Sequence, residues 1–231
     1  MRIEVLANAD AVARKAATLI AAEARKAVAA RGRFVMAVSG GHTPWVMLRA
    51  LAEEDVPWES VHIFQVDERV APEGHADRNL THLRESLLEH APLPARQIYA
   101  MPVDMPDLQS AAAKYAAELQ RIAGTPPVLD LVHLGLGPDG HTASLVPGDP
   151  VLDVTDRDIA VTGVYQGRNR LTLTYPVINR ARLILFLVTG SEKVPMFKRL
   201  QTADPSIPAG RVLQNNAVLL ADSAAAERKI A

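Results

Sequence analysis

The sequence contains no cysteine, few aromatic residues and no excess of charge of either sign. Because cysteine is absent from all 231 residues, disulfide bonds, thiolate metal sites and a cysteine nucleophile are excluded. Aromatic residues make up only 4% of a chain that is 48% hydrophobic, so aliphatic side chains must fill the core. The formal net charge of −1 provides no electrostatic reason to expect binding to nucleic acid or to an anionic membrane.

Long apolar runs are also absent. The N-terminal stretch MRIEVLANADAV is too polar for a signal peptide, and no later run is long enough to span a bilayer. We therefore expect a soluble, cytoplasmic protein with no membrane partner. No repeat, linker or change in composition divides the chain, so we expect a single domain over residues 1–231.

Short apolar runs alternate with amphipathic segments of helical length. Strands are expected at residues 2–6, 33–38, 61–66, 129–136, 158–165, 170–175, 182–188 and 217–222, and helices at 9–31, 45–54, 80–89, 107–123 and 191–201. This alternation is typical of an α/β fold in which a mostly parallel sheet carries helices on both faces. The strands at 158–165 and 170–175 interrupt it, and a local antiparallel pair is expected there.

Polar residues gather directly after the predicted strands. Such clusters occupy residues 39–43, 67–69, 137–144 and 191–193. Because ligands in open α/β sheets bind outside the carboxyl ends of the strands, we expect these four clusters to share one crevice.

The first cluster, SGGHTP, has the features of an anion-binding turn. Gly40 and Gly41 allow backbone N–H groups to face a ligand, and the N-terminus of the following helix adds partial positive charge. Ser39 and Thr43 add hydroxyl groups. The segment has no lysine of its own, so it is not a P-loop, and an ordinary tight turn is the alternative.

Three cations are further candidates for binding an anion. Lys193 lies in the first turn of a predicted helix, where its charge opposes the helix dipole unless an anion is bound. Arg69 and Arg170 are suited to bidentate capture of phosphate or carboxylate. The alternative for each is a solvated surface position.

The segment GLGPDGHTASLVPG, residues 135–148, begins with the glycine spacing of a dinucleotide-binding turn. Pro147 leaves room for only about two helical turns, and Asp158 begins the next predicted strand instead of ending it, so we reject the nucleotide interpretation. The Asp-Gly turn instead presents His141 at the edge of the sheet. Histidine suits general acid–base catalysis at neutral pH, although a lone histidine is more often structural. Either Asp67 or Asp139 could orient its ring.

The seven histidines include no pair spaced for a shared metal ion. We therefore expect no required metal and no cofactor. His133 lies within a predicted strand and is expected in the core, whereas His75, His82 and His90 are expected at the surface.

The motifs AVSGGHTP, VDERVAP, LGLGPDGHTASLVPG, RLTLTYPVINRARLILFLVTGSEK and IPAGRV occur in the order found in 6-phosphogluconolactonases, and the chain resembles that family. The larger group also contains glucosamine-6-phosphate deaminases and ribose-5-phosphate isomerases, but HTASLVPG after DGH is similar to the lactonases. The resemblance implies a modified Rossmann-like fold and hydrolysis of 6-phosphoglucono-δ-lactone to 6-phosphogluconate.

The resemblance also implies roles for individual residues. His141 would be the general base, and the loop from Ser39 to Thr43 would contact phosphate and sugar together with Arg69, Arg170 and Lys193. The glycine loop at Gly137 is a further candidate for contact with substrate. Two positions depart from the family: His42 replaces a small residue, and Asn79 lies in RNL where the family has a stretch similar to SNY.

Two other functions remain possible on the sequence. A deaminase or isomerase of amino-sugar phosphates would use Asp67 as a carbon base, and a sensor domain would bind a sugar phosphate without chemistry. The lactonase interpretation predicts a small phosphorylated sugar lactone as ligand, no nucleic-acid partner, and a monomer or weak homodimer.

Overall fold

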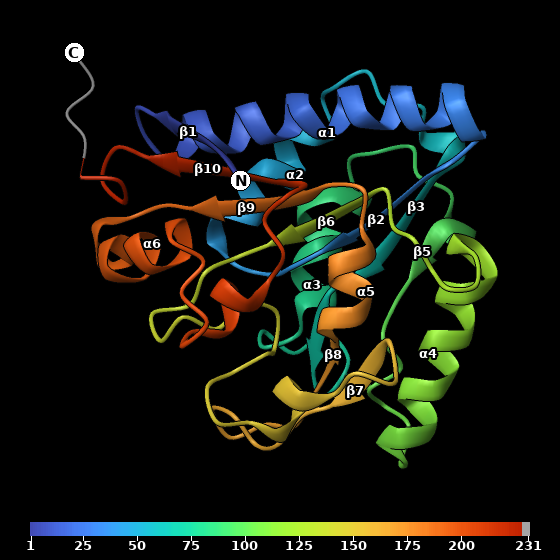
Figure 1. Ribbon diagram of the computed structural model, residues 1–231. Coiled ribbons are helices and arrows are strands. Elements are labelled where there is room, and N and C mark those ends of the chain that lie inside the picture. The colour runs from blue at the N-terminus through green and yellow to red at the C-terminus, as the bar shows by residue number, and fades with distance from the viewer. Residues whose placement is uncertain (228–231) are drawn as a thin grey trace.

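A parallel sheet of seven strands forms the centre of the structure, a computed structural model that describes residues 1–227 (Figure 1). Its spatial order is β1 (Arg2–Leu6), β10 (Ala217–Asp222), β9 (Ile184–Val188), β6 (Leu131–Leu134), β2 (Phe34–Val38), β3 (Val61–Gln65) and β5 (Ile98–Tyr99). Every pairing in it is parallel. The carboxyl ends of all these strands therefore lie at one edge, as the sequence predicts.

Helices cover both faces of this sheet, which confirms the predicted α/β class. One face packs against α1 (Ala9–Arg31), α2 (His42–Leu51) and α3 (Asn79–Leu83), and the other packs against α4 (Leu108–Ala123), α5 (Tyr175–Arg180) and α6 (Val194–Gln201). Alternate residues of one strand serve the two faces: Phe34 and Met36 belong to the first core, and Val35 and Ala37 to the second. Burial on both faces explains why these strands are apolar throughout.

The long helix α1 begins and ends where its sequence indicates. The Asn8 side chain caps its N-terminus by accepting a hydrogen bond from the N–H of Ala11 at 2.9 Å. Gly32 ends it in the left-handed conformation, with φ 73°, and donates its N–H to the carbonyl of Val28. The buried face of α1 is mostly alanine, which allows the helix to lie close to the sheet and to α2.

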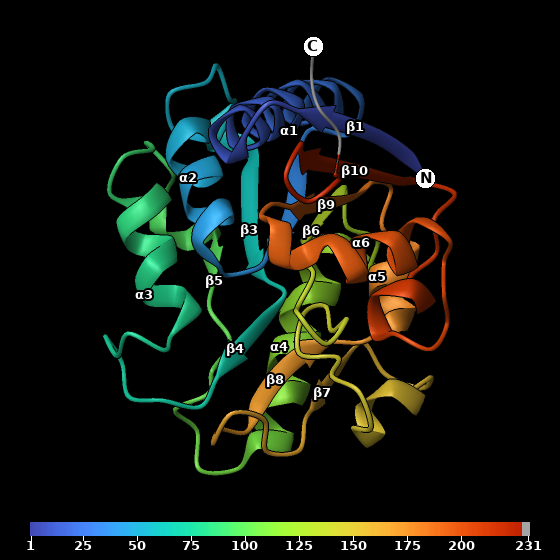
Figure 2. The same cartoon turned by 90° about the vertical axis from the view of Figure 1, so that its left-hand side faces the viewer.

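A second, antiparallel sheet lies beside the main one and contributes to the same edge (Figure 2). It contains β4 (Asp67–Arg69), β8 (Arg170–Leu173) and β7 (Ile159–Val161), in that order. The predicted antiparallel pair is therefore present. The segment at 67–69, predicted as a polar cluster after a strand, is itself a strand, because it pairs with β8 more than 100 residues later.

The remaining differences from the predicted elements are local. The strand predicted at 129–136 ends at Leu134, and the helix predicted at 80–89 is α3 followed by a π-helical turn at Arg84–Leu88. The helix predicted at 191–201 begins with a 3-10 turn at Ser191–Lys193. The strand predicted at 158–165 ends at Val161, and neither the two-residue strand β5 nor the helix α5 was predicted. Short 3-10 turns also occur at Trp58–Ser60, Ala95–Gln97, Pro150–Asp153 and Pro208–Arg211.

No helix within residues 1–227 is long and apolar enough to cross a membrane.

Candidate active site

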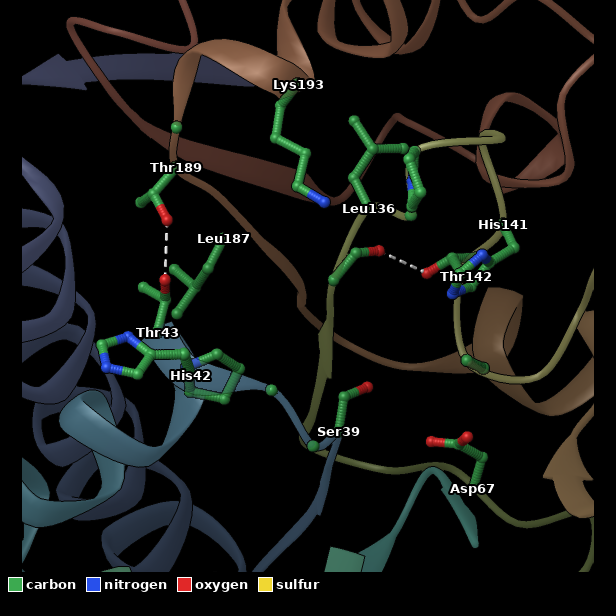
Figure 3. A pocket seen from close by; sticks show the side chains of 18 of the residues that line it. Ser39, His42, Thr43, Asp67, Leu136, His141, Thr142, Leu187, Thr189 and Lys193 are labelled. Carbon is green, nitrogen blue, oxygen red and sulfur yellow. Dashed lines mark hydrogen bonds between the residues drawn. The ribbon is translucent and has the colours of Figure 1, made fainter. Parts of the chain in front are cut away.

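A cavity of about 580 Å³ opens at the carboxyl edge of the main sheet (Figure 3). This volume lies within the range typical of small-molecule sites, roughly 300–1,000 Å³. All four predicted polar clusters contribute to its wall. Its lining includes Ser39, Gly40, Gly41, His42, Thr43, Asp67, Arg69, Asn79, Gly137, His141, Arg170, Thr189, Lys193 and Asp222. The expected convergence of the strand-end clusters is therefore present.

His141 borders the cavity and is held by a carboxylate behind it. Its Nδ1 lies 2.5 Å from Oδ1 of Asp139, and its backbone N–H donates to the same oxygen at 3.1 Å. Partial burial raises the pKa of Asp139, but the backbone N–H and ring of His141 and the hydroxyl of Tyr165 outweigh this effect, and the pKa falls below its usual value. Of the two acidic candidates, Asp139 is therefore the one in contact with the His141 ring, a choice the sequence left open.

Gly137 is required by the position of the His141 ring. A Cβ atom at residue 137 would lie 2.1 Å from Nδ1 of His141, which no real contact allows. The two residues are also joined through the backbone, since the N–H of Gly137 donates to the carbonyl of His141 at 2.8 Å. The glycine pattern that resembles a nucleotide-binding turn thus makes room for an imidazole.

Asp67 has different partners. The hydroxyl of Ser144 donates to its Oδ2 at 2.6 Å, and Nδ2 of Asn79 donates to its backbone carbonyl at 2.9 Å. Asn79, whose role was undefined in the sequence, therefore positions the Asp67 segment. A Cβ atom on Gly40 would lie 2.0 Å from Oδ1 of Asn79, so the close approach of the two loops needs glycine there.

A buried ion pair supports this side of the cavity and was not predicted. Glu68 is fully buried and accepts hydrogen bonds from the backbone N–H groups of Arg69, Asn79 and Leu80 at 2.8–2.9 Å. Nε of Arg78 lies 3.3 Å from its Oε2. Glu68 therefore joins β4 to the start of α3 and holds both Asp67 and Asn79 in place.

The glycine turn and Lys193 lie on the other side of the cavity (Figure 3). Oγ1 of Thr43 and Oγ1 of Thr189 are hydrogen-bonded at 2.6 Å, which ties the N-terminus of α2 to the end of β9. Lys193 extends into the cavity, and no ion pair to it is present within residues 1–227. Ser39 donates its hydroxyl to the carbonyl of His133 at 3.0 Å. The ring of His42 is exposed and directed away from His141.

Arg69 and Arg170 lie directly opposite each other on β4 and β8. Like charges in such a cross-strand pair destabilise a sheet unless an anion compensates them. The Nε atom of each is buried without a hydrogen-bond partner. Burial and the charge of Arg69 lower the pKa of Arg170. This arrangement favours an anionic or carbonyl oxygen between the two guanidinium groups.

His133 lies below the glycine turn, in the centre of the sheet, as expected of a core residue. It is fully buried, and burial lowers its pKa to about 3. The neutral ring accepts the backbone N–H of Ser39 through Nδ1 at 3.3 Å. His75 and His90 are surface residues, as predicted, whereas His82 stacks on Trp45 with ring centroids 4.0 Å apart.

Within the described part of the chain, no group of three or more histidine or acidic side chains forms a metal-binding cluster. Sequence reasoning also missed Tyr165, which contacts both Asp139 and Arg170, and Asp222, whose carboxylate accepts the N–H of Gly190 at 3.1 Å. Each is the last residue of a predicted strand, 158–165 or 217–222, and this position at the carboxyl end is the signal the sequence offers.

Comparison with known proteins shows the family to which the chain belongs. A family model described as glucosamine-6-phosphate isomerases/6-phosphogluconolactonase matches residues 7–220. A 6-phosphogluconolactonase from Synechocystis sp. is 39% identical over 225 residues, which cover 95% of this chain and 93% of the relative. The crystal structure of 6-phosphogluconolactonase from Thermotoga maritima superposes with a TM-score of 0.85 at 26% identity, covering 96% of this chain and 98% of that one.

A monomeric glucosamine-6-phosphate deaminase has the same fold, with a TM-score of 0.86 and coverage of 99% of this chain and 100% of its own. At 17% identity this likeness extends to the fold alone. The match of the family model over most of the chain, together with the Synechocystis relative, shows that the protein belongs to the glucosamine-6-phosphate isomerase/6-phosphogluconolactonase family.

Proposed function

We propose that this protein hydrolyses 6-phosphoglucono-1,5-lactone to 6-phosphogluconate, with His141 as the general base. The observation that carries the proposal is the joint presence, in one cavity, of a histidine backed by a carboxylate and an amide-lined turn with nearby cations. The relatives named as 6-phosphogluconolactonases support the choice of substrate.

His141 activates water in this mechanism. Because Asp139 accepts the Nδ1–H of the ring, Nε2 keeps its lone pair and is free to accept a proton from water. The oxygen of that water then forms a bond to C1 of the lactone. General-base assistance of this kind typically accelerates a reaction by about 10²–10⁴-fold.

The addition step places negative charge on the carbonyl oxygen. Arg170 and backbone N–H groups of the glycine loops are the groups available to stabilise that charge. When the carbonyl re-forms, the bond between C1 and the ring oxygen breaks, and the ring oxygen takes the proton from the His141 imidazolium. The products are the open-chain acid and a neutral imidazole, so the base is regenerated.

The phosphate group binds at the opposite side of the cavity. The N-terminus of α2, the hydroxyl of Thr43 and the ammonium of Lys193 form an anion-binding arrangement there. The contacts between the phosphate and these groups hold the reacting carbon next to the activated water, which makes the attack effectively intramolecular. Asp67 assists by positioning sugar hydroxyl groups and Ser144, and Arg69 adds positive charge.

Lactone disappearance, measured with and without protein, tests the proposal, because δ-lactones also open spontaneously. We expect hydrolysis above the spontaneous rate, and we expect the non-phosphorylated gluconolactone to be a much poorer substrate. His141→Ala is expected to lower kcat by about a hundredfold or more with KM largely kept. His90→Ala, at an exposed histidine, is the matched control and is expected to behave like the wild type.

Two results would reject this function. One is near-normal turnover by His141→Ala. The other is release of ammonia from glucosamine-6-phosphate without lactone hydrolysis, which would assign the deaminase reaction.

A further inference from the structure

We propose that Tyr165 is a positioning residue for two side chains next to the cavity: its hydroxyl group holds Asp139 behind His141, and its ring holds Arg170 toward the cavity. This inference rests on the proposed function of His141 as a base. Tyr165 itself does not line the cavity, so it acts through these two neighbours.

The hydroxyl group of Tyr165 is hydrogen-bonded to the oxygen of Asp139 that does not face His141. Tyr165 donates to Oδ2 of Asp139 at 3.0 Å, while Oδ1 of the same carboxylate faces the His141 ring. A carboxylate held at both oxygens cannot rotate away from Nδ1 of His141. The aromatic ring adds a lateral restraint, since it meets the imidazole edge-on with centroids 5.5 Å apart and an interplanar angle of 68°.

The ring of Tyr165 also supports the arginine. The guanidinium carbon of Arg170 lies 5.0 Å from the ring centroid, within the range of a cation–π contact. Without a restraint, repulsion from Arg69 on the facing strand would push Arg170 aside. Gln166 adds a second restraint by accepting a hydrogen bond from Nη2 of Arg170 at 3.1 Å.

A tight turn presents Tyr165 at this point. Its N–H donates to the carbonyl of Arg168 at 3.0 Å, and Gln166 and Gly167 take φ values of 51° and 78°. The left-handed conformation at both positions is that of a type I′ hairpin turn. Because the turn is mostly exposed and Tyr165 lies outside both hydrophobic cores, the hydroxyl can be removed without unfolding the protein.

The charged groups around Tyr165 come from several segments. Asp139, His141 and Arg170 face it directly, with Nδ1 of His141 at 3.5 Å from the hydroxyl group. Arg170 is in turn surrounded by Arg69, Asp67 and Asp77. Burial and Asp139 raise the pKa of Tyr165, so the phenol remains a neutral donor at physiological pH.

Two substitutions separate the hydroxyl from the ring. Tyr165→Phe keeps the face against Arg170, and we expect kcat to fall roughly 10- to 150-fold with KM unchanged, the rate equivalent of one hydrogen bond to a charged group. Tyr165→Leu removes the ring as well, and we expect KM to rise in addition, because Arg170 contacts substrate before and during reaction. Tyr99→Phe is the matched control, since its hydroxyl contacts Nδ1 of His62 at 3.0 Å on β3 and β5, at the far edge of the main sheet.

A second measurement does not depend on turnover. The ¹H–¹⁵N spectrum of the His141 ring should show mainly the Nδ1-protonated tautomer in the wild type and a mixture of tautomers in Tyr165→Phe, with thermal unfolding midpoints alike. If the wild type fails to hydrolyse the lactone, the proposed function fails while the spectrum still tests the hydroxyl. Wild-type kcat and an unchanged tautomer in Tyr165→Phe would overturn the role of Tyr165.

Discussion

At the scale of single residues, the two acidic candidates have separate partners. Asp139 contacts the ring and the backbone of His141, whereas Asp67 is held by Ser144 and Asn79. Both side chains are acidic and both follow a strand, so their residue types do not distinguish them. Their hydrogen bonds do, and this difference leads to a direct comparison of two variants.

We expect Asp139→Asn to lower kcat by about a hundredfold, because an amide can donate to Nδ1 and stabilise the tautomer in which Nε2 carries the proton. Asp67→Asn keeps an oxygen for Ser144 and is expected to change kcat much less. Steady-state kinetics of the two variants at neutral pH provides the comparison. The opposite order, with Asp67→Asn the inactive variant, would instead indicate that Asp67 is the base.

We expect Lys193→Ala to raise KM roughly tenfold with little change in kcat, because it removes a charged contact to a phosphate far from the reacting carbon. Lys198→Ala is the control, since Lys198 pairs with Glu227 at the surface. Steady-state kinetics of both variants over a range of lactone concentrations provides the KM values. An unchanged KM for Lys193→Ala would show that this ammonium does not hold the phosphate.

At the scale of elements, the position of Asp67 beside the cavity depends on the contacts between β4 and α3. Glu68 accepts three backbone N–H groups and faces Arg78, and both side chains are almost completely buried. The strand carries Asp67 and Arg69, and the helix begins with Asn79. One carboxylate therefore positions the two elements that contribute Asp67, Arg69 and Asn79 to the wall of the cavity.

We expect Glu68→Gln to destabilise the protein by about 3–5 kcal/mol, because it removes the buried carboxylate beside the Arg78 guanidinium and leaves that group paired with the mostly exposed Asp104. Urea unfolding at pH 7 measures the difference. Glu85→Gln is the control on the adjoining turn, where the carboxylate is mostly exposed and pairs with His82, and we expect a change within about 0.5 kcal/mol. Equal stability of Glu68→Gln and the wild type would contradict a structural role for this pair.

At the scale of the whole molecule, the cavity is held from below by the centre of the sheet. His133 on β6 lies under the glycine turn and is neutral, since burial lowers its pKa to about 3 from an ordinary value of 6.5. Between these two pH values the unfolded chain binds a proton that the folded chain does not. The stability that depends on neutral His133 is therefore complete above pH 6.5 and is lost as pH falls toward 3.

We expect the free energy of unfolding of the wild type to fall between pH 7 and pH 5 by about 2 kcal/mol more than that of His133→Leu, which has no group to protonate. At pH 7 the variant is expected to be less stable by about 1–3 kcal/mol, because the N–H of Ser39 loses its acceptor. Urea unfolding at pH 7, 6 and 5 measures both effects, with His90→Leu as an exposed control. If the free energy of unfolding depends on pH in the same way for the wild type and His133→Leu, His133 is not the buried neutral group that we describe.

Much of the fold followed from local patterns. The alternation of apolar strands with helices predicted the parallel sheet, Gly32 predicted the end of α1, and the polar residues after each strand predicted the edge where the cavity opens. These features depend on residue types close together in the chain, so the sequence by itself determined them.

Only the tertiary structure decided which side chains act together within that edge. Tyr165 and Asp139 are 26 residues apart, Ser144 and Asp67 are 77 apart, and Arg69 meets Arg170 because β4 pairs with β8. Such pairings depend on strand register and on the path of turns, which periodicity and propensity do not specify. The sequence therefore determined that a polar edge with a histidine would form and placed Asp139 two residues before that histidine, and the packing of distant segments decided which side chains hold Asp139 and Asp67 in place.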